Sequence, residues 1–331
     1  MRKICLLTVL FLGISLQTYG QGRISGLAFG DFYYIASHHN QALRDQNGFW
    51  FRRIYFTYDR DLGEQFTTRL RLEMNHPGNF TAGDAIPFVK DAYLQWDFHA
   101  QHRFYLGILP APMFDLIEAL WGYRSVEKTP GDLFRLGSPR EVGLSFQGSL
   151  LETGVVRYHV AFGNNEATRS EGYRGKKLAL ALQLLPQPWA VEVYGDYGRL
   201  REGEQATTWH GLLGYRTPSL RLGAIYEAQE VTIERGRDYT LRYFSVFGSG
   251  QVAPRLYVFG RIDRMLEPNP RVGNNPYLPL ATTSKATLWI GGVDIAMTPQ
   301  VRFQPNVELV RYDEEGLDSD VFLRWTFFVT F

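Results

Sequence analysis

Cysteine is almost missing from this chain of 331 residues, in which Cys5 is the single example. A disulfide needs two cysteines and cysteine-based zinc sites need several, so both kinds of cross-link are excluded. No Leu-x-Gly-Cys motif surrounds Cys5, which argues against a lipid anchor. The fold must therefore be held by packing and hydrogen bonds.

Strong net charge and long apolar runs are missing as well. The formal net charge is +1, and it is −1 once Arg2 and Lys3 are left out, so no basic field points to nucleic acid. A transmembrane helix needs about 20 consecutive apolar residues, and no segment beyond residue 21 supplies them. Aromatic residues nevertheless make up 15% of the chain. Two classes fit this composition: a soluble all-β protein and a transmembrane β-barrel.

Signatures of catalysis and cofactor binding are also missing. The chain contains no His-Glu-x-x-His pair, no Gly-x-Ser-x-Gly elbow and no Gly-Lys-Ser/Thr phosphate loop. We therefore expect no enzyme activity, no cofactor and no metal site. The acidic stretch YDEEGLDSD, with Glu314 and Glu315, could bind a cation through its oxygens, or it could be a solvated loop.

The first 21 residues have the pattern of a secretory signal peptide. Arg2 and Lys3 precede an apolar run from Ile4 to Leu16, and small or turn-forming residues follow near Gly20. We expect residues 1–21 to be removed and residues 22–331 to form one domain outside the cytoplasm.

What the remainder does contain is alternation. In FTTRLRLEMN, Phe66, Leu70 and Leu72 fall on one face of a β-strand, while Arg69 and Arg71 fall on the other. About sixteen segments of roughly ten residues, the length of a tilted membrane strand, can be read between residues 24 and 331. Pro305 lies inside one of them, where it requires a bulge or a shorter strand.

The connections between these segments alternate between short and long. An up-and-down membrane barrel has short periplasmic turns and long external loops, whereas a sandwich has no reason for this order. We therefore predict an all-β fold, a transmembrane antiparallel β-barrel of about 16 strands. A secreted β-sandwich that binds glycans, and a barrel enzyme of the outer membrane, are the alternatives.

The final segment, VFLRWTFFVTF, alternates throughout and ends on Phe331. A terminal Phe of this kind resembles the last strand of outer-membrane barrels, which the barrel-assembly machinery reads. The resemblance implies that the protein lies in the cell outer membrane of a Gram-negative bacterium, in contact with its lipid.

A narrower resemblance covers about a third of the chain. FWFRRIYFTYDRDLGEQFTTRLRLEMN, VKDAYLQW, YLGILPAPMF and SPREVGLSFQG follow one another in an order and spacing similar to the phosphate-selective porin O and P family. This resemblance implies a porin, a homotrimer, and a third long loop that folds into the barrel. The chain departs from the family in having 6 lysines against 29 arginines.

Residues 110–139 form that third long loop. Phe114, Ile117, Leu120 and Trp121 recur at helical spacing, which predicts a short amphipathic helix. If the loop enters the barrel, its charged residues would border a constriction: Arg124, Glu127, Lys128, Asp132 and Arg135. An external flap is the alternative.

The inward parity of the strands collects arginines. We predict that the pore is lined by Arg53, Arg69, Arg71, Glu73, Arg103, Arg157, Arg216, Arg221, Arg302 and Arg324. Guanidinium groups stay charged and offer forked donors to anions, so such a series could guide anions, or it could brace the wall by pairing with carboxylates. The predicted function is passive diffusion of small hydrophilic solutes, with small anions as possible cargo.

Overall fold

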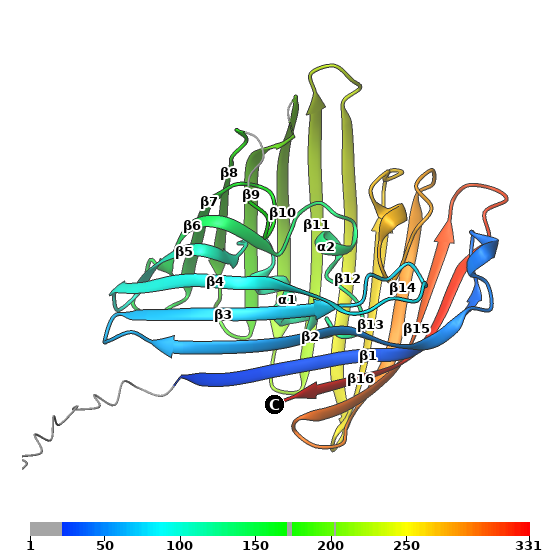
Figure 1. Ribbon diagram of the computed structural model, residues 1–331, viewed down its shortest axis with the longest axis horizontal. Coiled ribbons are helices and arrows are strands. Elements are labelled where there is room, and N and C mark those ends of the chain that lie inside the picture. Colours follow the sequence, from blue (N-terminus) through cyan, green and yellow to red (C-terminus); the bar gives the residue numbers. More distant parts are fainter. Residues whose placement is uncertain (1–21, 171–173, 202) are drawn as a thin grey trace, which may run out of the picture.

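A computed structural model describes residues 22–331 except 171–173 and 202, so the expected signal peptide lies outside the described residues. In this part of the chain, sixteen antiparallel strands each pair with their sequence neighbours, and β1 pairs with β16 to close a barrel (Figure 1). The strands are β1 (Arg23–Ser37), β2 (Asn47–Asp61), β3 (Phe66–Asn75), β4 (Ile86–His99), β5 (His102–Pro110), β6 (Arg140–Ser149), β7 (Val156–Gly163), β8 (Lys177–Leu184), β9 (Trp189–Arg201), β10 (Glu204–Arg216), β11 (Leu220–Ile233), β12 (Tyr239–Ala253), β13 (Leu256–Met265), β14 (Ala286–Ala296), β15 (Val301–Tyr312) and β16 (Asp320–Thr330). The closed barrel confirms the predicted fold class and rules out the sandwich.

Helices are few and short. They are η1 (Gln41–Leu43), α1 (Asp115–Trp121), α2 (Pro130–Leu133) and η2 (Val272–Asn274). None of the helices among the described residues has the length and hydropathy to cross a membrane.

The seam between β1 and β16 closes at the chain terminus. The Phe331 N–H donates to the Gly26 carbonyl at 3.0 Å, and the Gly26 N–H donates to the Phe331 carbonyl at 2.8 Å. The ladder continues from Leu27 opposite Thr330 toward the other end of the barrel. The terminal Phe is therefore part of the closing ladder.

The two faces of the wall differ in polarity along each strand. In β8, Leu178 and Leu182 are 56% and 45% exposed, whereas Lys177 and Ala179 are buried. An apolar outer face and a polar inner face are what a barrel in lipid requires, because the outer side chains meet hydrocarbon. The outer surface therefore belongs in a membrane.

Two β-bulges place consecutive charged residues on the inner face. Phe29 of β1 pairs with Arg53 of β2, and Gly30 pairs with Phe51, so Arg52 is the extra residue in β2. In β4 the extra residue is Lys90, which stands next to Asp91. A bulge sets two residues against one on the partner strand, so neighbouring side chains can share one face.

Pro305 lies within β15, and no register shift accompanies it. It pairs with Trp325 on the β16 side, while the ladder to β14 lacks pairs between Gly292 and Ile295. The missing proline N–H therefore falls in a gap of the ladder, and the expected bulge or shortened strand is not needed.

The alternation of connection lengths is less strict than the sequence indicated. β9 ends at Arg201 and β10 begins at Glu204, although a longer loop was expected there. The β10–β11 ladder runs out to Glu204 opposite Ile233, and in Figure 1 the β11–β12 hairpin beside it rises highest of the wall. The polar residues assigned to loops there instead extend the strands.

Candidate pore constriction

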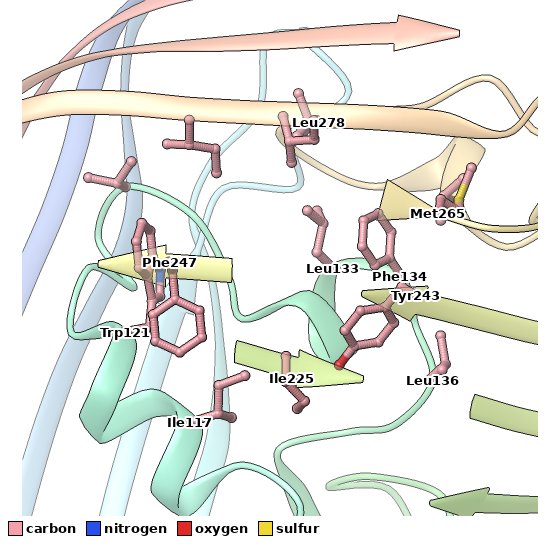
Figure 2. Close-up of a cluster of buried hydrophobic side chains, with 14 of the residues drawn as sticks. Ile117, Trp121, Leu133, Phe134, Leu136, Ile225, Tyr243, Phe247, Met265 and Leu278 are labelled. Carbon is pink, nitrogen blue, oxygen red and sulfur yellow. The ribbon is translucent and has the colours of Figure 1, made fainter. Parts of the chain in front are cut away.

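The connection between β5 and β6 folds into the barrel, and Figure 1 shows α1 and α2 within the ring of strands. Helix α1 contacts β10, β11 and β12. Its apolar face is buried: Ile117, Leu120 and Trp121 are each at most 2% exposed. Gly122, with φ of 69°, ends the helix in the left-handed conformation that glycine adopts at low cost. Figure 2 shows Ile117 and Trp121 beside Ile225 and Phe247.

Polar contacts fix the loop at the turn after α1. The Trp121 indole N–H donates to the Glu127 carbonyl at 2.9 Å, and the Arg261 guanidinium lies 5.0 Å from the Trp121 ring. From the opposite wall, Arg52 donates to the Val126 carbonyl at 2.6 Å and to the Glu127 carboxylate at 3.2 Å. The loop is therefore attached to the barrel wall on two sides.

A second connection, residues 266–285, also packs inward. Asn269 donates to the Phe134 carbonyl at 2.8 Å, and Asn275 donates to the Leu133 carbonyl at 2.9 Å. Leu278 and Leu280 are each 1% exposed. The sequence indicated only a long polar connection here, so two loops rather than one reduce the lumen.

The space that remains between the constriction loop and the wall of β1 to β6 is strongly charged. Arg71 and Lys90 from the wall, Glu118 and Arg124 from the loop, and Arg140 at the start of β6 line a cavity of about 280 Å³. We call this group, together with Arg53, Glu73, Asp91, Lys128 and Asp132, the charged constriction.

On the wall, two carboxylates each form ion pairs with two cationic side chains. Glu73 contacts Lys90 in a short ion pair and lies 3.5 Å from the Arg53 guanidinium. Asp91 contacts Arg140 in a short ion pair and lies 3.1 Å from Arg71. Each of the two carboxylates is thus shared, and the wall retains surplus positive charge.

The loop continues the same pattern. Arg124 lies 2.9 Å from Asp132 and 3.3 Å from Glu118, and Lys128 lies 3.5 Å from Asp132. Burial alone would raise the pKa of Asp132, but Lys128, Arg124 and Arg53 hold it well below its usual range. Burial also lowers the pKa of Lys128, which Asp132 opposes. The charged constriction contains six cations against four carboxylates, a surplus of two positive charges.

The remaining predicted residues divide between this site and other places. Arg69 is paired with Asp59 at 2.6 Å, and Arg103 with Asp97 at 2.8 Å. The Arg157 Nε donates to the Gly154 carbonyl at 3.2 Å beside a short turn.

Arg216, Arg221 and Arg302 come together at the end of the barrel that carries the short turns. They line a cavity of about 480 Å³ with Ser249 and Tyr257. Arg302 pairs with Asp294 at 2.5 Å, and Arg216 lies directly opposite Arg221 in the β10–β11 hairpin. Arg216 and Arg221 thus bring two positive charges together, which makes this mouth of the barrel cationic as well.

Three predicted residues contact the inward-folded loops, and two of them, Arg324 and Glu127, are buried. Arg324 is 1% exposed and donates to Asp31 at 3.0 Å, to Glu308 at 3.1 Å and to the Tyr277 carbonyl at 2.5 Å. Glu127 is 1% exposed beside Arg52. Arg135 donates to Asn275 at 2.8 Å and so joins the two inward loops. These side chains hold the loops in place.

Sequence reasoning omitted Arg52, Lys90 and Arg140 from the lining residues. Arg52 and Lys90 sit at bulges, which strict alternation assigns to the wrong face. The available signal was two charged residues in succession within a strand, as in Arg52–Arg53 and Lys90–Asp91.

Comparisons with known proteins agree on the architecture. No protein-family model matches the sequence, and no curated protein matches it. Among solved structures, an anion-selective porin from Comamonas acidovorans has a TM-score of 0.66 and 12% identity over 94% of this chain and 99% of that one. OprB of Pseudomonas putida has a TM-score of 0.68 and 9% identity over 94% of each chain. A loop L8 deletion mutant of OmpT, an outer membrane protein of Vibrio cholerae, has a TM-score of 0.67 and 12% identity over 94% of this chain and 99% of that one.

Identities this low show the fold, and the narrower resemblance to the phosphate-selective porins is not confirmed by a family match. The chain is a sixteen-stranded barrel with the fold of outer-membrane porins, and this fold together with its apolar outer surface places it in the outer membrane.

Proposed function

We propose that the protein is a channel for passive diffusion of small hydrophilic solutes and that it prefers anions. The observation that carries this proposal is the charged constriction, in which six cations share four carboxylates. The net positive charge there repels a passing cation. A passing anion is attracted, because it can bind cations that otherwise share a carboxylate.

The exposure of the cations supports a role in the pore. The side chains of Arg71 and Arg124 are 21% and 18% exposed, whereas that of Asp91 is fully buried. Glu118 is the most exposed carboxylate of the group, with its side chain 31% exposed, so solutes that enter the cavity meet two guanidinium groups against one carboxylate. Planar, forked donors suit phosphate and carboxylate groups, which makes small phosphate-like or carboxylate anions the preferred cargo.

The arginines at the short-turn mouth favour the same direction of selectivity. No ion pair with a carboxylate is found for Arg216 or Arg221 among the described residues, and Arg221 donates to Ser249 at 3.2 Å. An anion that leaves the constriction would meet a second cationic region before it leaves the barrel. Assembly as a homotrimer, and recognition of Phe331 by the barrel-assembly machinery, belong to the same proposal.

The test is the reversal potential of Arg124→Gln in a planar bilayer that separates two KCl concentrations. A unit charge about 4 Å from an ion contributes about 1 kcal/mol in a water-like dielectric, stabilising chloride and destabilising potassium, so the chloride-to-potassium permeability ratio should fall about 30-fold. Arg242→Gln is the matched control, because Arg242 is paired with Glu267 outside the lumen. Equal ratios for wild type and Arg124→Gln would remove the constriction from the selectivity mechanism.

A further inference from the structure

Three side chains with metal-ligating atoms meet at the end of the barrel that carries the long loops. His38 and His39 follow β1, and Asp320 begins β16, so the group lies across the seam that closes the barrel. One ligating atom from each residue lies within 4.8 Å of the other two. The His39 Nδ1 is 3.0 Å from the Asp320 Oδ1, and the His38 Nε2 is 3.9 Å from the Asp320 Oδ2.

The His38 ring carries an unused polar atom. His38 is fully buried, and its Nδ1 accepts the Asn40 backbone N–H at 2.9 Å. Its Nε2 is also buried and has no hydrogen-bond partner. A buried polar atom without a partner costs about 1–3 kcal/mol, so such an atom pointing toward a carboxylate calls for an occupant.

We propose that His38, His39 and Asp320 bind a divalent transition-metal ion of the zinc class. Two imidazole nitrogens and one carboxylate oxygen are ligands that Zn²⁺ prefers, and a water can complete a four-coordinate site. Bonds of about 2.0–2.1 Å in a tetrahedral site put ligand atoms on the order of 3.3 Å apart. The Asp320 Oδ2 lies 3.0 Å from the His39 Nδ1 and 3.9 Å from the His38 Nε2, on either side of that spacing. All three ligating atoms lie within 4.8 Å of one another, so a bound ion would draw the side chains closer together.

Metal binding requires the other neutral tautomer of each of the two imidazole rings. The His39 proton, which Nδ1 now donates to Asp320, moves to Nε2 on a side chain that is 17% exposed to water. The His38 proton moves from Nε2 to Nδ1, and the Asn40 N–H turns away at a cost of about 0.5–1.5 kcal/mol.

Neighbouring groups hold the carboxylate in place. The His39 backbone N–H donates to the Asp320 Oδ1 at 2.7 Å, and the Tyr312 hydroxyl donates to Oδ2 at 2.5 Å. Tyr312 also accepts the Ala281 N–H at 3.1 Å, which connects the group to the inward-packed residues 266–285. A bound ion would therefore join β1, β16 and the loop that packs on the constriction.

The experiment uses the full refolded barrel, freed of metal with EDTA and titrated with ZnCl₂ by isothermal calorimetry. Wild type should bind one equivalent. Asp320→Asn and His39→Gln should each weaken binding by on the order of 100-fold or more, since even outer partners of a ligand are worth 10–100-fold. The cobalt(II)-loaded protein should show the absorption of a tetrahedral ion, which the variants should lose.

A matched control is His99→Gln with His102→Gln, a second histidine pair at the opposite end of the barrel whose rings lie 5.1 Å apart. This control should keep the zinc equivalent. Circular dichroism establishes that each variant has refolded. Absence of the equivalent in wild type, or its loss in the control and not in Asp320→Asn, would overturn the proposal.

Discussion

The attachment of the constriction loop at Trp121 can be tested by Trp121→Ala. The indole is 1% exposed, packs against Phe247 and Phe259, lies under Arg261 and donates to the Glu127 carbonyl. Removing a buried Trp costs about 3–5 kcal/mol. Each 1.4 kcal/mol is a factor of ten, so the ratio of undocked to docked loop should rise by roughly two to four orders of magnitude. The barrel itself should remain closed, because every strand ladder is untouched.

The assay is single-channel conductance in a planar bilayer, with circular dichroism in detergent to establish that the barrel has formed. Trp121→Ala should show larger or more strongly fluctuating conductance than wild type, because the loop no longer blocks the lumen continuously. Trp209→Ala is the matched control, since Trp209 faces outward and is 47% exposed. Wild-type conductance in Trp121→Ala, with the barrel folded, would refute the attachment of the loop through Trp121.

Two further predictions concern assembly and pH. Phe331 exchanges two backbone hydrogen bonds with Gly26. Its deletion should reduce insertion of the barrel in cells more than refolding in detergent. Equal losses in both assays would mean that Phe331 acts only in closing the barrel between β1 and β16. Burial lowers the pKa of His38 below its ordinary 6.5; Asp320 opposes this shift and His39 adds to it. Because the unfolded chain then takes up the proton at a higher pH than the folded chain, the free energy of unfolding should fall as pH drops below 6.5. In EDTA, the loss of melting temperature between pH 7 and pH 5 should be smaller in His38→Gln than in wild type, and an equal loss would contradict the assignment.

Alternation predicted the barrel because it is a local property of the chain. A strand such as β3 shows its two faces in ten consecutive residues, and the number of such segments gave sixteen strands. The apolar spacing of Phe114, Ile117 and Trp121 also predicted a helix, and α1 forms there. These features need no information from distant parts of the sequence.

The rest depends on partners that are distant in sequence. His39 meets Asp320 across 281 positions, and Arg135 meets Asn275 across 140. Bulges at Arg52 and Lys90 shift the parity without a strong local signal, because the extra residue is recognised only against the partner strand. For that reason the sequence identified many inward charges but not which of them the folded loops would cover.

The most direct test of the central claim is the reversal potential of the wild-type barrel, refolded without residues 1–21, across a tenfold KCl gradient. A surplus of two positive charges in the charged constriction predicts channel openings and a potential of the sign given by chloride permeation. Channels with a potential of the potassium sign, or a folded barrel that opens no channels, would contradict the account.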